Sequence, residues 1–93
     1  MREVQSAEAA YSKSIEKLTR IAGPQLENPS TPLLSSYREK LMLLDSAVDV
    51  LKAEAERNPY NHHIRRELLA LYQDKQRTLE GIINEKQNQS RAN

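Results

Sequence analysis

The 93-residue chain carries 14 Lys and Arg, 13 Asp and Glu and no cysteine, and its formal net charge is +1. The lack of cysteine excludes disulfides and thiolate metal sites, and the near-zero net charge predicts no general attraction to nucleic acid or anionic lipid. No stretch approaches the roughly 20 apolar residues of a membrane span, and Glu3 and Glu8 stand where the apolar segment of a signal peptide would lie. Ala, Leu, Glu, Lys, Arg and Gln dominate, which predicts helices in one small domain, residues 1–93.

A first helix is expected over about residues 3–22. Its inward positions recur at helical spacing: Val4, Ala7, Tyr11, Ile15, Leu18 and Ala22. Gly23 and Pro24 are expected to end this helix, because glycine suits a left-handed cap and proline does not continue a helix. Residues 24–32 contain three prolines and are expected to form a stiff connector.

A second helix is expected over residues 32–57, with Thr31 as N-cap and Pro32 at the first helical position. Its inward stripe follows steps of three and four residues: Leu34, Tyr37, Leu41, Leu44, Val48, Leu51 and Ala55. Further apolar residues widen the arc: Leu33, Leu43, Ala47 and Val50. A helix this broadly apolar usually contacts two neighbours, so we expect it to lie centrally, between the first and third helices.

A third helix is expected over about residues 61–86, capped by Asn58 or Asn61, with residues 87–93 as a frayed tail. Its inner face holds apolar side chains that become sparse between Lys75 and Thr78: Ile64, Leu68, Leu71, Tyr72, Leu79, Ile82 and Ile83. Short connections make neighbouring helices antiparallel. The predicted fold class is therefore all-α, with three long helices in an up-down-up bundle.

The side chains that could act in catalysis or bind a metal do not form a recognisable catalytic or metal-binding motif. His62 and His63 are adjacent on a helix, so their side chains point about 100° apart and do not converge on one ion. Arg65 and Arg66 make the third helix basic, without the aromatic platform typical of nucleic-acid binding. Asp45 and Asp49 are a like-charged pair four residues apart, which is best explained by basic partners across the bundle. We expect no enzyme activity, cofactor, metal or nucleic-acid partner.

Residues 33–44 and 68–79 resemble each other at an offset of 35 residues. Tetratricopeptide repeats have a period of about 34 residues, but such a repeat would break into two helices between Tyr37 and Ala47, where this chain has no turn signal. Two similar long helices packed face to face explain the same residues. A tetratricopeptide-like, peptide-binding adaptor stays as an alternative.

Three segments carry a closer resemblance: Leu33–Ala47, the turn region Ala55–Asn61, and Leu68–Lys75. Together with Ala9–Leu18 they resemble the helical C-terminal region of bacterial, membrane-anchored zinc-finger proteins of the anti-sigma-factor type. The resemblance implies an extracytoplasmic (periplasmic) accessory domain behind one membrane span. The zinc ligands of that family lie in a cytoplasmic N-terminal module, and because this chain has no cysteine, the zinc-finger function is not carried over.

The resulting prediction is a non-enzymatic helical protein-interaction module, the accessory or sensory domain of a membrane-anchored anti-sigma-type transcription regulator. It would contact a protein partner or self-associate as a homodimer, and reach the membrane only through a segment absent from this chain. The candidate interaction surface comprises Leu43, Val50, Tyr60, Arg65 and Arg66.

A small-ligand sensor is a further alternative, with a ligand slot lined by tyrosines. An enclosed polar cavity near Tyr37 and Tyr72 would favour it, whereas a break between Tyr37 and Ala47 would favour the adaptor.

Overall fold

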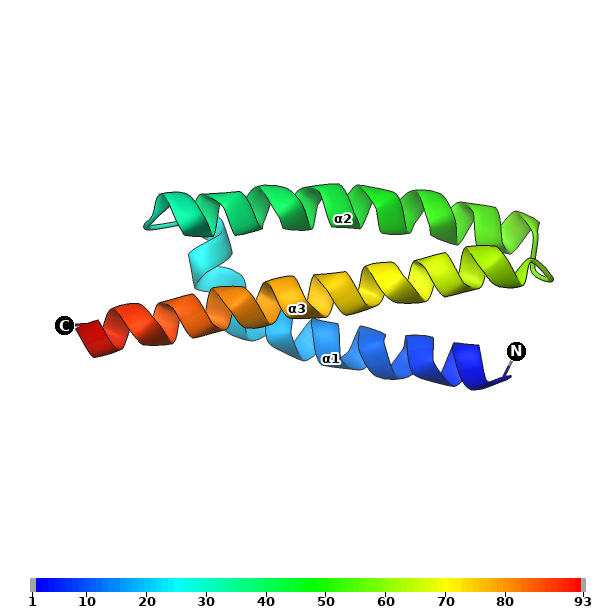
Figure 1. The fold of residues 1–93 in the computed structure, drawn as a ribbon, viewed down its shortest axis with the longest axis horizontal. Helices are drawn as coiled ribbons and strands as arrows, with labels where there is room; N and C mark the ends of the chain where they lie inside the picture. Colours follow the sequence, from blue (N-terminus) through cyan, green and yellow to red (C-terminus); the bar gives the residue numbers. More distant parts are fainter. Residues whose placement is uncertain (1, 93) are drawn as a thin grey trace.

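The computed structural model describes residues 2–92, and the side chains of residues 6–88. These described residues form three α-helices and no strand: α1 (Arg2–Glu27), α2 (Pro32–Arg57) and α3 (His62–Ala92). The helices α1 and α3 run in the same direction and α2 runs in the opposite one (Figure 1). The predicted all-α, up-down-up bundle is confirmed.

The central helix is α3, not α2. Along its length α3 packs against both α1 and α2, whereas α1 and α2 have little contact with each other. The prediction that the helix 32–57 lies between its neighbours is therefore wrong. The reason is that Leu43 and Val50, which seemed to widen its inward arc, point about 160–180° away from Leu41 at 3.6 residues per turn, and they are 73% and 62% exposed.

The core is a row of apolar side chains along α3, to which each outer helix adds one narrow stripe. It is built from Ile15 and Ala22 of α1, Leu34, Leu41 and Val48 of α2, and Leu68, Tyr72, Leu79 and Ile82 of α3. These are positions that the periodicity placed inward, whereas the side chain of Val4 lies outside the described residues. The molecule is accordingly long and thin, with extents of 51 × 21 × 16 Å.

The helix α1 continues through Gly23 and Pro24 to Glu27, so the predicted end at Ala22 is wrong. Within the described chain no glycine has a positive φ, and the Asn28 amide donates to the Pro24 carbonyl at 3.3 Å. Proline removes a backbone donor and bends a helix without having to end it. Figure 1 shows the last turns of α1 (cyan) directed steeply toward the start of α2.

Side-chain caps start both later helices. The Thr31 hydroxyl accepts from the Leu34 amide at 3.1 Å, with Pro32 at the first position of α2, as predicted. Of the two asparagines offered by the sequence, Asn61 caps α3: its side-chain Oδ1 accepts hydrogen bonds from the backbone amides of His63 and Ile64 at 3.1 and 3.2 Å. These caps satisfy amides that have no partner inside the helix.

The C-terminal part of α3 is helical through Ala92, where a frayed tail was expected. Residues 87–92 contain neither glycine nor proline, so no local signal stops the helix once it has formed. Figure 1 shows this end (red) projecting past the start of α2.

The aromatic ring of Tyr37 packs directly on Gly81 of α3. A Cβ atom at Gly81 would lie 3.0 Å from the Tyr37 Cζ, whereas a Cβ atom at Gly23 would meet nothing within 4 Å. Both glycines are inside helices. They therefore form a matched pair that separates helix propensity from packing.

We expect Gly23→Ala to raise the free energy of unfolding by about 0.5–1 kcal/mol, because alanine favours a helix and the added methyl group has open space. Gly81→Ala makes the same gain but presses on the Tyr37 ring, so its net effect is expected to be zero or destabilising. Urea unfolding followed by circular dichroism measures both.

The control is Gly81→Ala in a Tyr37→Leu background, where the propensity gain should reappear. A loss of stability in Gly23→Ala would contradict the continuous helix, since alanine is unfavourable in the left-handed conformation of a glycine cap.

Candidate interaction surface

The side of α2 that faces away from the core carries an apolar stripe with a charge at each end. We name Lys40, Leu43, Ala47, Val50 and Glu54 the outer stripe. Their steps of three, four, three and four residues keep them on one side of a helix. Leu43 and Val50 are 73% and 62% exposed, and Ala47 between them is half-buried.

The five residues predicted from the sequence do not form one patch. Leu43 and Val50 share the outer stripe, but Tyr60 is 88% exposed at the turn between α2 and α3, at one end of the bundle. Arg66 is exposed on α3. Arg65 is removed from the surface, because its side chain is only 15% exposed and pairs with Glu8.

The Glu8–Arg65 pair joins α1 to α3 near the start of α3. The Arg65 Nη1 lies 3.7 Å from the Glu8 Oε2, and the Glu8 side chain is 18% exposed. The Glu8 Oε1 and the Arg65 Nε are buried without a hydrogen-bond partner. A pair with such incomplete hydrogen bonding offsets little more than its own desolvation. The prediction of Arg65 as a surface residue failed because its partner is distant in sequence.

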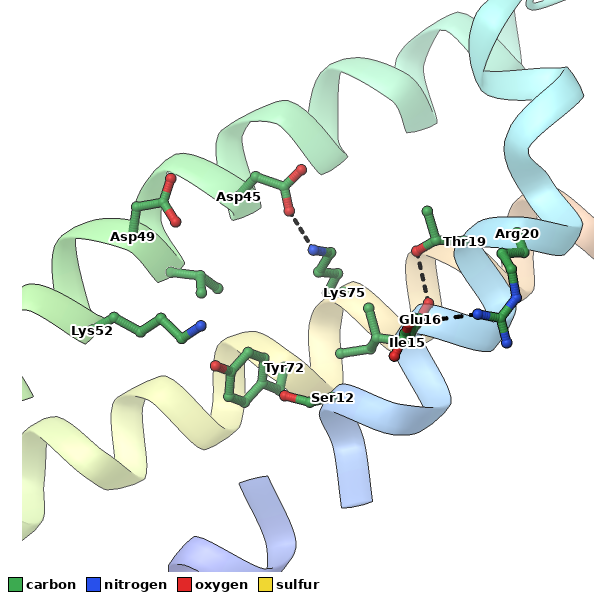
Figure 2. Close-up of a pocket in the computed structure, with 11 residues that line it drawn as sticks. Ser12, Ile15, Glu16, Thr19, Arg20, Asp45, Asp49, Lys52, Tyr72 and Lys75 are labelled. Atoms are coloured by element: carbon green, nitrogen blue, oxygen red, sulfur yellow. Dashed lines mark hydrogen bonds and ion pairs between the residues drawn. The ribbon is translucent and has the colours of Figure 1, made fainter. Parts of the chain in front are cut away.

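A groove lies between α1 and α2, with α3 as its floor (Figure 2). Its volume is about 710 Å³. The lining residues are Ser12, Ile15, Glu16, Thr19, Arg20, Asp45, Val48, Asp49, Lys52, Tyr72 and Lys75. The sequence did not predict this groove, because a central second helix would have packed directly on the first helix and left no space between them.

Lys75 projects from α3 into this groove, and its Nζ lies 2.5 Å from the Asp45 Oδ1 (Figure 2). The expected basic partner of Asp45 is thereby found. The lining charges balance, with three cations (Arg20, Lys52 and Lys75) and three anions (Glu16, Asp45 and Asp49). The groove therefore has no net preference for an anionic or a cationic ligand.

The four tyrosines do not surround one cavity. Tyr72 lines the groove, but Tyr37 is packed on Gly81. The Tyr11 hydroxyl accepts a hydrogen bond from the Gln73 amide nitrogen at 3.2 Å, which joins α1 to α3. The tyrosine-lined slot on which the ligand-sensor hypothesis depends is thus absent from the described residues.

His63 takes part in an ion pair within α3. His63 pairs with Glu67 one turn later, at 3.1 Å between Nε2 and Oε1, on the exposed side of α3. Among the described residues, no three His, Asp or Glu side chains are grouped so that they could hold a metal ion. In the same part of the chain, no helix has the length and hydropathy needed to span a membrane.

Comparisons with family models, with curated proteins and with solved structures found no match to this chain. The resemblance to the anti-sigma-type helical domain therefore depends on the sequence motifs alone.

Replacing Glu8 by Leu is expected to lower the free energy of unfolding by about 1–3 kcal/mol, because it leaves the mostly buried Arg65 guanidinium without its anion. Replacing both residues, as Glu8→Leu with Arg65→Met, should recover most of that loss, since apolar groups of similar volume need no partner. Chemical unfolding of the single and double variants measures the coupling.

The matched control is Arg66→Met, at the exposed neighbouring position, which should stay within about 0.5 kcal/mol of wild type. A neutral Glu8→Leu variant would show that the ion pair does not hold α1 on α3.

Proposed function

We propose that this chain is a non-enzymatic helical interaction module that contacts another protein through the outer stripe of α2. The observation that carries the proposal is the exposure of Leu43 and Val50, at 73% and 62%, on the side of α2 opposite the core. Scattered exposed apolar residues are normal on a protein surface. Two that are seven residues apart, with an alanine between them, have the spacing of the seam by which one helix recognises another.

The rigidity of α2 supports this use. The helix is continuous from Pro32 to Arg57, its first amides are capped by Thr31, and its inner stripe is anchored in the core through Leu34, Leu41 and Val48. A preorganised helix loses little conformational entropy when a partner binds. The outer stripe is therefore presented in a fixed register.

The setting that we propose is a membrane-anchored transcription regulator of the anti-sigma-factor type, in which this chain is the accessory or sensory region on the extracytoplasmic side. Support comes from the similarity of Leu33–Ala47, Ala55–Asn61 and Leu68–Lys75 to that family. In such a regulator, contact between helical regions would set the state of the whole protein. The complete gene product should then carry a Cys/His-rich module followed by a span of about 20 apolar residues.

The unbroken α2 favours this proposal over a tetratricopeptide-like adaptor. That repeat needs two helices where residues 32–57 form one. The similarity of residues 33–44 to residues 68–79 has a simpler cause, because α2 and α3 supply opposing stripes to the same interface.

We expect a photo-crosslinking amino acid at position 43 or 50, in the complete protein in its own cells, to label one specific protein. The physical reason is that both positions are exposed and lie on the same stripe. The same amino acid at Lys17, an exposed position of α1, serves as control and should not label that protein. Mass spectrometry of the crosslinked product identifies it.

The regulatory setting has its own test. Leu43→Ser with Val50→Ser should leave the free energy of unfolding within about 0.5 kcal/mol of wild type and alter transcription of the genes that the regulator controls. Met42→Ser, at a 61% exposed position on another flank of α2, should not. If the double variant and the control transcribe alike, the outer stripe has no part in regulation.

A further inference from the structure

The charges on the outer stripe are arranged so that the stripe complements itself when it is reversed. Lys40 and Glu54 each lie seven residues from Ala47, on opposite sides, and Leu43 and Val50 lie four and three residues from it. Turning one copy end for end about Ala47 therefore places each Lys40 near the Glu54 of the other copy, and each Leu43 near a Val50.

We infer that the partner of the outer stripe is a second copy of this chain, bound with the two α2 helices antiparallel and the two-fold axis at Ala47. The inference depends on the proposed function, since it names the occupant of the same surface. A parallel pair would place Lys40 on Lys40 and Glu54 on Glu54, and like charges across a helix pair are unfavourable. The order of charges thus selects the antiparallel pair.

The residues beside the stripe fit the same arrangement. Glu39 and Arg57 are exposed and project in the same direction from α2, because they are 18 residues, or five turns, apart. In the antiparallel pair Glu39 of one copy approaches Arg57 of the other. Arg57 also pairs with Glu54 of its own helix, so each end of the interface would hold a group of four charges.

The charged residues of the groove do not interfere with the antiparallel pair of α2 helices. Asp45, Asp49 and Lys52 face the space between α1 and α2 (Figure 2), on the flank of α2 away from the outer stripe. A second copy on the outer stripe leaves the groove open. The interface is small, with two large apolar side chains from each copy, so the dimer should be weak and reversible.

Single-cysteine variants test the register, because the natural chain has no cysteine. Ala47→Cys should form a disulfide-linked dimer under mild oxidation. Leu43→Cys and Val50→Cys alone should not, since two equivalent positions would lie about 12 and 9 Å apart along the helix axis, beyond the Cα separation of about 4–7 Å that a disulfide spans. An equimolar mixture of Leu43→Cys and Val50→Cys should crosslink, and only as a mixed dimer.

Charge reversal tests the same register without cysteine. Lys40→Glu and Glu54→Lys should each weaken the dimer at least about fivefold, because each change replaces two attractions by two repulsions. The two variants mixed together should associate about as well as wild type, since every contact is again between opposite charges. Sedimentation equilibrium at low salt measures the affinities of wild type, of each variant and of the mixture, and circular dichroism checks that each variant remains helical.

The outcomes separate this inference from the proposed function. A wild-type chain that stays monomeric up to about 1 mM, a concentration that detects even weak interfaces, overturns the inference, as does self-crosslinking of Leu43→Cys. If position 43 or 50 labels a different protein in cells while the purified chain is monomeric, the interaction module stands and the second copy is wrong. If these positions label nothing, both are wrong.

Discussion

The packing of α3 against two neighbours is the constraint on which the rest of the structure depends. One helix supplies Leu68, Tyr72, Leu79 and Ile82 to a shared core, and the outer helices add a narrow stripe each. In a chain of 93 residues the core is necessarily small, and this arrangement uses it for two interfaces at once. Because α3 lies between them, α1 and α2 have little mutual contact.

Two features follow from that separation. The space between α1 and α2 is a groove, across which Lys75 of α3 pairs with Asp45 of α2. Among the described residues nothing packs on the far side of α2, so Leu43 and Val50 are exposed. Among the described side chains α1 adds fewer buried apolar residues to the core than α2 does, and polar contacts such as the Glu8–Arg65 pair join it to α3 as well.

The sequence predicted the number of helices and their inward faces, but neither the ends of α1 and α3 nor the way the helices pack on one another. Periodicity identified the inward stripe of each helix, and Thr31 was recognisable as a cap because capping is a local interaction. Periodicity does not say which helix is central, since it describes a face and not the element that covers it.

The end of α1 was predicted wrongly because the stop signal of Gly23 and Pro24 is local, whereas Leu26, beyond them, packs against the core. The partner of Arg65 was beyond sequence reasoning, since Glu8 lies 57 residues away.

Leu43 and Val50 were predicted as candidate surface residues and are exposed, but the structure gives a different reason for their apolar character. Leu43 and Val50 were identified as part of an apolar arc wide enough for two neighbours, and within this chain α2 packs extensively on one neighbour, α3. The inner stripe of α2 packs against α3, and the outer stripe, on the opposite side, remains exposed. A width that suits two neighbours is explained if the second one is a separate molecule. The reversed order of Lys40 and Glu54 about Ala47 then favours a second copy, because complementarity to oneself requires a charge pattern that inverts about its centre.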